Sequence, residues 1–400
     1  MKTAEHYSLL HHNTFGIDQL CDAFVEWESE GDAMAVARQL RDSHKPYLLL
    51  GGGSNLLLTD DFHGTVVTPA RRFDLSVIMS YDDNVPSLRC WAGTTFDDVV
   101  DYAVRHGYYG LENLSLIPGE CGASAVQNIG AYGAEVKDVI SEVEAIEIST
   151  GRRVVFKGSD CGYSYRQSRF KHEWKDQYLI TYVTYRLSRQ FKPELDYGNI
   201  RSRLEQLGID ETKLTAAQLR DIIIDIRRQK LPDPEVTGNA GSFFMNPIVD
   251  AATFQQLKAA HPNLHYFEVS GADGQPAYKI PAGWMIDQCG WKGRSLGRAG
   301  VYDKQALILV NRGGATGQEV VDLMHAIQHD VKETFGLDLK PEVNILSASP
   351  QPPPEEGEKV HRQPICAHPL LFSVCTRSPS SGGGWGEASP LFFSFMELPV

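Results

Sequence analysis

The amino-acid sequence predicts an α+β fold, in which strands and helices follow one another without a regular strand–helix–strand repeat. Short apolar runs typical of strands recur along the chain, and amphipathic runs typical of helices separate only some of them. Two glycine-rich segments, residues 51–55 and 117–133, interrupt this pattern. A doubly wound sheet requires regular alternation of strands and helices, so these observations favour an α+β arrangement.

The first half of the chain reads mainly as short strands. Thr95 is a plausible N-cap of a helix at 95–106, and Thr150-Gly151 is a turn signal between two strands of a hairpin. The pattern predicts helices at 32–43 and 95–106, and strands at 47–50, 56–59, 65–68, 75–79, 88–92, 143–149, 153–156 and 178–187.

A second region begins near Thr215, which can cap a helix that runs to Lys230. Pro232 and Pro234 end this helix, because proline cannot continue it. The pattern further predicts helices at 251–260 and 317–335 and strands at 306–311 and 342–346. Residues from 349 onward are rich in proline, serine and glycine and lack any period, so we expect a disordered tail.

Composition excludes several classes of protein. The 400 residues suggest two or three domains, and the net charge of −13 argues against a nucleic-acid surface. No signal-peptide pattern is present, and no apolar run approaches the roughly 18 residues that a membrane helix needs. The seven cysteines form no CxxC pair and no zinc spacing. We therefore expect a cytoplasmic protein with reduced thiols, no metal site, and neither nucleic-acid nor membrane partners.

The two glycine-rich segments carry the strongest functional signal. Glycine allows successive backbone N–H groups to converge on an anion. The first segment lacks the lysine of a P-loop, and a strand rather than a helix is predicted after it, unlike a Rossmann fingerprint. Alone, Gly51–Gly53 is equally well explained as a tight turn between strands. Together the two segments indicate a pyrophosphate held from two sides, as in FAD bound outside a Rossmann fold.

Four further residues are candidates for chemistry, and each has a plainer explanation. Ser242 follows a glycine between aromatic residues, but it could be a turn hydroxyl. Arg166 could pair with a substrate carboxylate or form a structural ion pair. Glu342 lies in an apolar strand, where a carboxylate is costly unless it is paired, or on an exposed edge strand. Lys230 could bind an anion or simply complement the helix dipole.

Taken together, six blocks in order resemble the family of UDP-N-acetylenolpyruvoylglucosamine reductase, also called UDP-N-acetylmuramate dehydrogenase. The resemblance covers about residues 13–346, and the stretch 189–211 resembles the extra loop of the first-type subfamily. The blocks are GGGSNL at 51–56, IPG through NIGAYG at 117–133, YR at 165–166, KLPDP at 230–234, GNAGSFFMNP at 238–247, and PEV at 341–343.

The resemblance implies a domain organisation. Residues 1–188 would form a two-lobed FAD-binding domain of the vanillyl-alcohol-oxidase-like type, with lobes at about 1–72 and 73–188. Residues 189–214 would be a connecting loop region. Residues 215–346 would form an α+β substrate-binding domain whose last strand returns to the first lobe, and 347–400 would be a disordered tail. The family further implies a monomer.

The resemblance also implies a reaction. NADPH would reduce FAD and leave, and the reduced flavin would pass hydride to the enolpyruvyl group of UDP-N-acetylglucosamine enolpyruvate, giving UDP-N-acetylmuramate for peptidoglycan synthesis. Arg166 and Glu342 match the positions that polarise the substrate carboxylate, and Ser242 matches the general acid. Negative charge develops on the carboxylate during this step, so a nearby cation is needed.

Binding residues carry over from the same blocks. The substrate-binding positions would be Tyr197, Lys230, Asn246 and Gln288. Asn344 and Met245 depart from the family, because a basic residue is common at both positions. The cofactor-binding positions would be Gly51, Gly52, Gly53, Ser54, Asn55, Pro118, Gly119, Gly122, Ala123, Gln127, Asn128, Gly130 and Ala131.

Two alternatives remain open from the sequence. One is an FAD-dependent oxidase or dehydrogenase of the same fold that acts on an alcohol or a sugar. The other is a flavin- or nucleotide-binding module without activity. The blocks at 238–247 and 341–343 favour the reductase over the oxidase. The presence of Arg166, Ser242 and Glu342 favours an active enzyme over the binding module.

Overall fold

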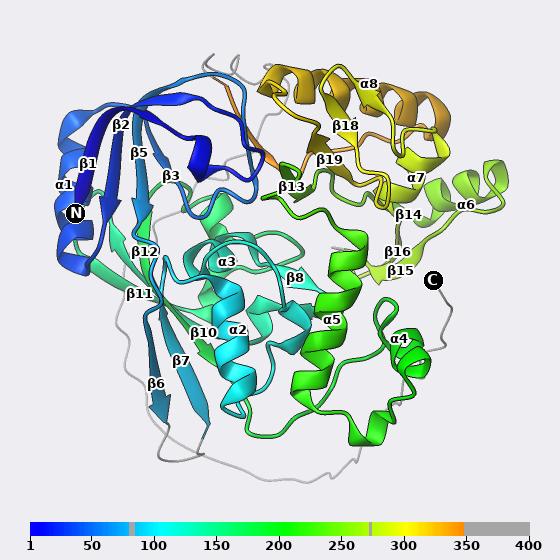
Figure 1. Cartoon of the computed structure of the whole chain (residues 1–400), viewed down its shortest axis with the longest axis horizontal. Coiled ribbons are helices and arrows are strands. Elements are labelled where there is room, and N and C mark those ends of the chain that lie inside the picture. Colours follow the sequence, from blue (N-terminus) through cyan, green and yellow to red (C-terminus); the bar gives the residue numbers. More distant parts are fainter. Residues whose placement is uncertain (80–84, 272–273, 348–400) are drawn as a thin grey trace, which may run out of the picture. The chain divides into compact units, whose positions relative to one another are not determined.

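The computed structural model describes residues 1–79, 85–271 and 274–347. Residues 1–347 belong to one compact unit. The predicted tail lies outside the described residues except for its first position, 347. Within the described ranges, both helices and strands alternate irregularly, which confirms the predicted α+β class (Figure 1).

The first sheet has the strand order β1-β2-β5-β3. β1 pairs antiparallel with β2, whereas the two other pairs are parallel. Helix α1 (Glu30–Ser43) connects β2 to β3 and begins where the Ser29 hydroxyl accepts a hydrogen bond from the backbone N–H of Asp32. The strands are β1 (Lys2–Ser8), β2 (Leu20–Trp27), β3 (Tyr47–Leu49) and β5 (Phe62–Pro69).

The second sheet is antiparallel throughout, in the order β11-β10-β12-β7-β6. The predicted hairpin is confirmed, since β10 and β11 are neighbours in it. Helix α2 (Phe96–Arg105) also lies where the sequence predicts it, but the Thr95 hydroxyl makes no capping hydrogen bond, so that detail of the prediction is wrong. The strands are β6 (Leu75–Met79), β7 (Pro86–Trp91), β10 (Ile140–Glu147), β11 (Arg153–Lys157) and β12 (Tyr178–Arg186).

Helix α5 (Ala216–Lys230) opens the last third of the unit and contacts α2. Thr215 caps it, as the sequence predicts, and Gln218 completes a capping box with Thr215. Two antiparallel sheets follow, in the orders β13-β19-β18-β17 and β14-β16-β15. Their strands are β13 (Asn239–Ser242), β14 (Ile248–Asp250), β15 (Phe267–Ser270), β16 (Pro276–Lys279), β17 (Ser295–Leu296), β18 (Ala299–Val301) and β19 (Ile308–Asn311).

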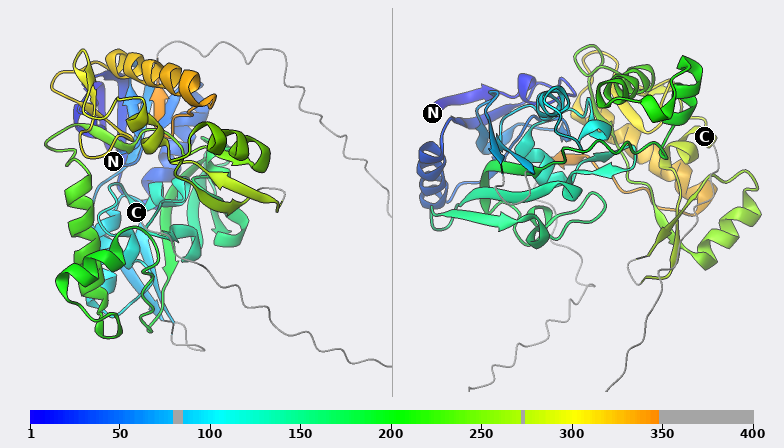
Figure 2. Two further views of the ribbon diagram at one scale, coloured as in Figure 1. Left: turned by 90° about the vertical axis from the view of Figure 1, so that its right-hand side faces the viewer. Right: turned by 90° about the horizontal axis from the view of Figure 1, so that it is seen from below.

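Three helices accompany these sheets: α6 (Ala251–Ala260), α7 (Ala282–Gln288) and α8 (Gly317–Phe335). After α8 the chain returns to the first sheet region. There β20 (Asn344–Leu346) pairs in parallel with β4 (Leu56–Leu58), which directly follows the first glycine-rich segment (Figures 1 and 2). One hydrophobic core accordingly includes residues from both ends of the unit, among them Phe15, Phe243 and Val343.

Several elements differ from the prediction, among them the strands β13 to β18 and the helix α7, which the sequence pattern did not predict. Neither β1 nor β2 was predicted, and the exposed positions of β1 carry polar side chains. Helix α4 (Ile200–Leu207) lies in the stretch expected to be a loop. Helix α3 (Cys121–Gln127) and the strands β8 (Gly130–Ala131) and β9 (Ala134–Glu135) lie in or beside the second glycine-rich segment. The last strand begins at Asn344, so Glu342 precedes it.

None of the helices in the described ranges combines the length and the apolar character that a crossing of the bilayer would need.

Candidate functional site

The two glycine-rich segments meet in space although more than sixty residues separate them. The Ser54 hydroxyl donates a hydrogen bond to the Pro118 carbonyl at 3.3 Å. A Cβ at Gly52 would lie only 3.3 Å from Cα of Gly119, so the close approach of the two backbones favours glycine at position 52. Gly119 itself has φ +112°, a conformation that side chains disfavour.

The first segment leaves backbone donors unused. Among the described residues, none accepts a hydrogen bond from the N–H groups of Gly51, Gly52, Gly53 or Ser54. Successive free N–H groups at a chain bend form an anion-binding nest. The diphosphate of a dinucleotide supplies the acceptors that such a nest lacks, so the residues present fit FAD at this place.

Backbone strain is concentrated around the second segment. Leu116, Asn128, Tyr132 and Arg166 all have φ between 48° and 58°, although none of them is glycine. Such conformations are uncommon for bulky residues and often mark functional sites, because the surrounding structure must hold them. Three of the four are in or next to residues 117–133, and the fourth is the predicted catalytic arginine.

Several predicted cofactor residues have side chains that bind the protein itself. Asn55 donates from Nδ2 to the carbonyl of Glu342 at 3.2 Å, and its own carbonyl accepts from Asn344. The Asn128 amide is buried and bonded to the Ser164 carbonyl at 2.8 Å. Gly122 packs against Ala92, where an added Cβ would be 3.0 Å from the alanine methyl. These residues shape the two segments, and their contact with FAD stays a prediction.

The remaining cofactor candidates in the second segment are half-buried or exposed backbone positions. Pro118 is exposed, and Ala123 faces Gly51 across the junction of the two segments. Gly130 and Ala131 form β8, and the Gly130 carbonyl accepts a hydrogen bond from Arg166.

Glu342 is the centre of a second group of polar side chains. Its Oε1 lies 2.9 Å from Nε of Arg166, and Gln127 donates to the same oxygen from Nε2 at 3.2 Å. The N–H of Arg166 Nε does not point at an acceptor, so the Arg166–Glu342 contact is an ion pair rather than an aligned hydrogen bond. Lys171 completes the group by donating to Oε1 of Gln127 at 2.9 Å.

The backbone fixes Arg166 in this position. Its Nη2 donates to the Gly130 carbonyl at 2.8 Å, while Nη1 lies 3.5 Å from the Asn128 carbonyl. The guanidinium thus joins the second glycine-rich segment to Glu342. The sequence predicts that Arg166 and Glu342 act on the same substrate carboxylate, and the structure places the two side chains next to each other.

More cations than carboxylates surround the Arg166–Glu342 pair. Lys171, Lys279 and Arg227 all lie within electrostatic range of Arg166. Burial lowers the pKa of each of these three groups and is the largest effect. Arg166 lowers each pKa further, whereas nearby acidic groups raise it in part: Glu342 at Lys171, Glu135 at Lys279, and Tyr132 and Asp97 at Arg227. The Nε atom of Arg227 is buried and has no hydrogen-bond partner among the described residues. This surplus of partly buried positive charge favours an anionic ligand.

Ser242 lies at the end of β13, opposite Ile308. It is exposed, and no hydrogen bond of its hydroxyl is found within the described ranges. Its neighbour Phe243 accepts a hydrogen bond from the backbone N–H of Glu342 at 2.8 Å. Ser242 therefore directly precedes a residue that is hydrogen-bonded to the backbone of Glu342, and its hydroxyl is available to a ligand.

Two of the predicted substrate residues, Asn246 and Tyr197, contact aromatic side chains, whereas the other two, Lys230 and Gln288, lie at exposed helix ends. Asn246 accepts a hydrogen bond from the backbone N–H of Ala282 at 2.9 Å. Its side chain also lies near Tyr165, the neighbour of Arg166; burial raises the pKa of that phenol, and the smaller effect of Asn246 lowers it. Tyr197 is exposed, and its ring is stacked 6.5 Å from that of Phe267. Lys230 and Gln288 are exposed at the ends of α5 and α7, and no contact in the described ranges links them to Arg166 or Glu342.

Sequence reasoning missed Lys171, Lys279 and Arg227. A signal existed only for Arg227, which lies three residues before Lys230 on the same helix. A cation at that spacing falls on the same helix face. Lys171 and Lys279 come from segments that only the folded chain brings to Arg166, so no local pattern could identify them.

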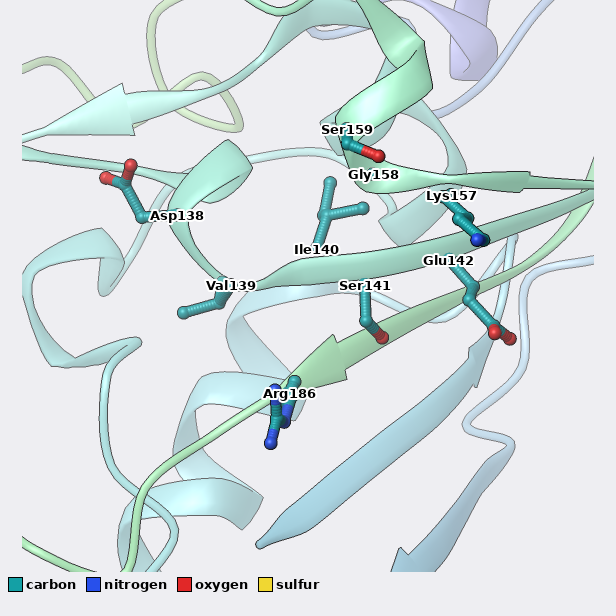
Figure 3. Close-up of a pocket in the computed structure, with 9 residues that line it drawn as sticks. All are labelled: Asp138, Val139, Ile140, Ser141, Glu142, Lys157, Gly158, Ser159 and Arg186. Carbon is teal, nitrogen blue, oxygen red and sulfur yellow. The ribbon is translucent and has the colours of Figure 1, made fainter. Parts of the chain in front are cut away.

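A separate pocket opens at one end of the second sheet, with a volume of about 440 Å³ (Figure 3). Glu142 and Lys157 lie opposite each other on β10 and β11 at its margin, and Arg186 contributes from β12. None of the predicted site residues lines this pocket. We therefore do not assign the candidate active site to it.

Comparison with known proteins agrees with this geometry. The family model for an FAD binding domain matches residues 21–157. The model for the C-terminal domain of UDP-N-acetylenolpyruvoylglucosamine reductase matches residues 233–346. The two glycine-rich segments fall within the first match, and Ser242 and Glu342 fall within the second.

Whole-chain relatives extend the match. UDP-N-acetylenolpyruvoylglucosamine reductase of Bacteroides fragilis strain YCH46 is 50% identical over 340 residues, which cover 85% of this chain and 99% of the relative. The enzyme of that name from Burkholderia ambifaria is 44% identical over 339 residues, or 84% of this chain and 95% of the relative.

A solved structure shares the fold. The crystal structure of UDP-N-acetylenolpyruvylglucosamine reductase (MurB) from Thermus caldophilus aligns with a TM-score of 0.58 at 22% identity, covering 86% of this chain and 98% of that one. The chain belongs to the UDP-N-acetylenolpyruvoylglucosamine reductase family, whose members are FAD-dependent enzymes of peptidoglycan precursor synthesis.

Proposed function

We propose that this chain reduces UDP-N-acetylglucosamine enolpyruvate to UDP-N-acetylmuramate with NADPH, and that Ser242 supplies the proton. FAD, when bound, supplies the hydride-transfer chemistry between NADPH and the substrate. The observation that carries the proposal is the surplus of cations around the Arg166–Glu342 pair. This surplus suits a substrate whose reacting group bears a carboxylate.

Arg166 would stabilise the negative charge that develops on the substrate carboxylate. Stabilisation of developing charge by preorganised groups is often the largest contribution to catalysis. The preorganisation here comes from Glu342 at 2.9 Å and from the Gly130 carbonyl at 2.8 Å, which together hold the guanidinium in place. The backbone of Arg166 is itself in the left-handed region, with φ 57°. Lys171 and Arg227 would add positive charge without needing to move.

Ser242 would donate a proton to the substrate carbon next to the carboxylate. A serine hydroxyl is a weak acid, so it can act only if it is placed close to that carbon. Its exposure and the absence of a hydrogen-bond partner in the described residues leave the hydroxyl available. The bond from the N–H of Glu342 to the Phe243 carbonyl fixes the serine relative to the carboxylate-binding group.

The remaining assignments are proposals of the same kind. Tyr197, Lys230, Asn246 and Gln288 would bind the rest of the substrate, with Asn246 best supported by its contact with Tyr165. We also propose the domain boundaries and the first-type subfamily inferred above, a monomeric state and a cytoplasmic location. The pairing of β20 with β4 supports a last strand that returns to the first lobe.

An anaerobic two-step experiment tests the proposal. The purified protein is examined for flavin absorbance, then mixed with NADPH, and then with UDP-N-acetylglucosamine enolpyruvate. We expect the oxidised flavin absorbance to bleach in the first step and to recover in the second. Bleaching without recovery would contradict the substrate assignment, and a protein that takes up no FAD would contradict the cofactor assignment as well.

A further inference from the structure

Glu120 lies at the junction of the two glycine-rich segments, and its carboxyl group is only half satisfied. The side chain is 5% exposed. Its Oε1 lies 3.3 Å from Nε of Arg71, whereas Oε2 is buried and has no hydrogen-bond partner among the described residues. Although Glu120 immediately precedes helix α3, its carboxylate does not cap that helix. The burial of Oε2 without a partner is therefore not explained by a capping role of Glu120 at α3.

The carboxyl group lies beside Gly51 and Gly52 of the first segment. A Cβ built at Gly51 would lie 3.6 Å from Oε2, and one built at Gly52 would lie 3.6 Å from Oε1. These two glycines belong to the nest whose N–H donors lack acceptors. A diphosphate bound there would place its negative charges close to Glu120, and an ionised carboxylate in that position would repel it.

We propose that Glu120 is a neutral carboxylic acid when FAD is bound, because an ionised carboxylate beside the FAD diphosphate would repel it, so that FAD binding takes up a proton. This inference rests on the proposed placement of the FAD diphosphate at the two glycine-rich segments. The proton comes from solvent and stays on Glu120, and the FAD diphosphate keeps its own charge.

The electrostatic surroundings of Glu120 agree with this role. Burial raises the pKa of Glu120 to about 7, and Arg71 offsets only part of that effect. Glu26 on β2 raises the pKa further, although Lys2 neutralises part of the Glu26 charge from 2.6 Å. His12 also lies beside Arg71, and burial lowers the pKa of its imidazole. The nearby cation, Arg71, is largely exposed and therefore screened by water.

The sign of the pH dependence follows from linkage. A bound diphosphate raises the pKa of Glu120 above its value in the free protein, so the complex holds more protons than the free protein does. FAD affinity is then constant below the free-protein pKa of about 7 and falls as the pH rises above it. The fall approaches about tenfold per pH unit until the pKa of the complex is reached.

The test measures FAD affinity rather than turnover. The full chain is depleted of flavin and titrated with FAD by fluorescence quenching at a series of pH values from about 6 to about 9. We expect the wild-type dissociation constant to rise roughly tenfold per unit above about pH 7. Glu120→Gln should bind with an affinity that does not change with pH, and it should bind more tightly than wild type at the alkaline end.

Two variants serve as controls. Glu112→Gln removes another buried carboxyl group with a raised pKa, one that is bonded to the Gly110 N–H away from the nest. His12→Gln removes the neighbouring imidazole. Both should keep the wild-type pH dependence. A pH dependence that persists in Glu120→Gln, or that vanishes in His12→Gln, would overturn the assignment to Glu120.

Proton uptake in the wild-type chain covers the case in which Glu120→Gln does not fold. In weakly buffered solution with a pH indicator, FAD binding should take up almost no proton near pH 6 and about one proton per FAD near pH 8. FAD binding without proton uptake near pH 8 would overturn the role of Glu120 and leave the cofactor assignment intact. Failure to bind FAD at any pH would overturn both.

Discussion

Arg166 and Arg220 are two arginines that each pair with a carboxylate, yet their surroundings differ in kind. Arg220 of α5 makes two parallel hydrogen bonds to Asp97 of α2, at 2.6 and 3.0 Å, and Asp101 lies 3.5 Å from its Nε. Its charge is therefore matched by two carboxylates. Arg166 has a single contact with Glu342, a left-handed backbone conformation, and three further cations within electrostatic range.

This difference in geometry and charge balance distinguishes a structural ion pair from one that binds a ligand. Bidentate geometry and balanced charge make the Arg220 group complete within the protein, so it can join α5 to α2 without any ligand. The Arg166 group is incomplete, because positive charge exceeds negative charge and the strained backbone has a cost of about 1–3 kcal/mol. An anionic ligand would complete it. The presence of an ion pair alone does not distinguish the two cases.

The largest effect is expected at Ser242. Ser242→Ala should keep FAD binding and reduction by NADPH, but it should slow reoxidation of the flavin by substrate by roughly 10²–10⁴-fold, because the proton donor is lost. Anaerobic stopped-flow absorbance measures both steps. Ser270→Ala, at another exposed serine on β15, should leave both rates unchanged. Reoxidation of Ser242→Ala at the wild-type rate would remove this serine from the mechanism.

A somewhat smaller effect is expected at Arg166. Arg166→Lys keeps the charge but loses the planar fork that spans Glu342 and the Gly130 carbonyl. Reoxidation by substrate should slow by about 10²–10³-fold, while the NADPH step and the urea midpoint of unfolding stay close to wild type. If the variant instead unfolded much more easily and still reoxidised normally, Arg166 would be a structural residue like Arg220.

The reverse pattern is expected at Arg220. Arg220→Met should lower the free energy of unfolding by about 2–3 kcal/mol, because Asp97 loses its partner in a largely buried place. Asp97 also accepts the backbone N–H of Leu116, so some of its hydrogen bonding remains. Both flavin half-reactions of the folded variant should stay within about twofold of wild type. Equilibrium urea unfolding measures the stability change, and a selective loss of reoxidation would contradict the comparison.

The smallest effect is expected from the tail. Its composition predicts no packed structure, and both family matches end by residue 346. Removal of residues 349–400 should therefore leave steady-state turnover and the unfolding midpoint unchanged. A marked loss of either quantity would show that the tail contributes to the folded enzyme.

The sequence was sufficient where a feature depends on a local run of residues. The N-cap of α5 at Thr215 and the hairpin of β10 and β11 follow from residue types at fixed spacing, and both are confirmed. Arg166 and Glu342 could be selected because each lies in a segment that resembles the family. Their mutual distance, however, depends on how β20 returns to β4, which no local pattern specifies.

The sequence was insufficient where burial or a distant partner decides the outcome. β1 is an edge strand with polar, exposed positions, so it lacks the apolar alternation that identifies strands. Lys171 and Lys279 are ordinary surface-type residues until the fold brings them to Arg166. Glu120 is one letter within a glycine-rich segment, and its unpaired Oε2 can be recognised only when the surrounding atoms are known.

The most direct test of the central claim compares wild type, Arg166→Lys and Arg220→Met in one anaerobic double-mixing experiment, with NADPH added first and UDP-N-acetylglucosamine enolpyruvate second. If the Arg166–Glu342 centre binds the substrate carboxylate, all three proteins bleach at similar rates, and only Arg166→Lys recovers slowly. Equal recovery in all three proteins, or slow recovery confined to Arg220→Met, would contradict the assignment of the reaction to this centre.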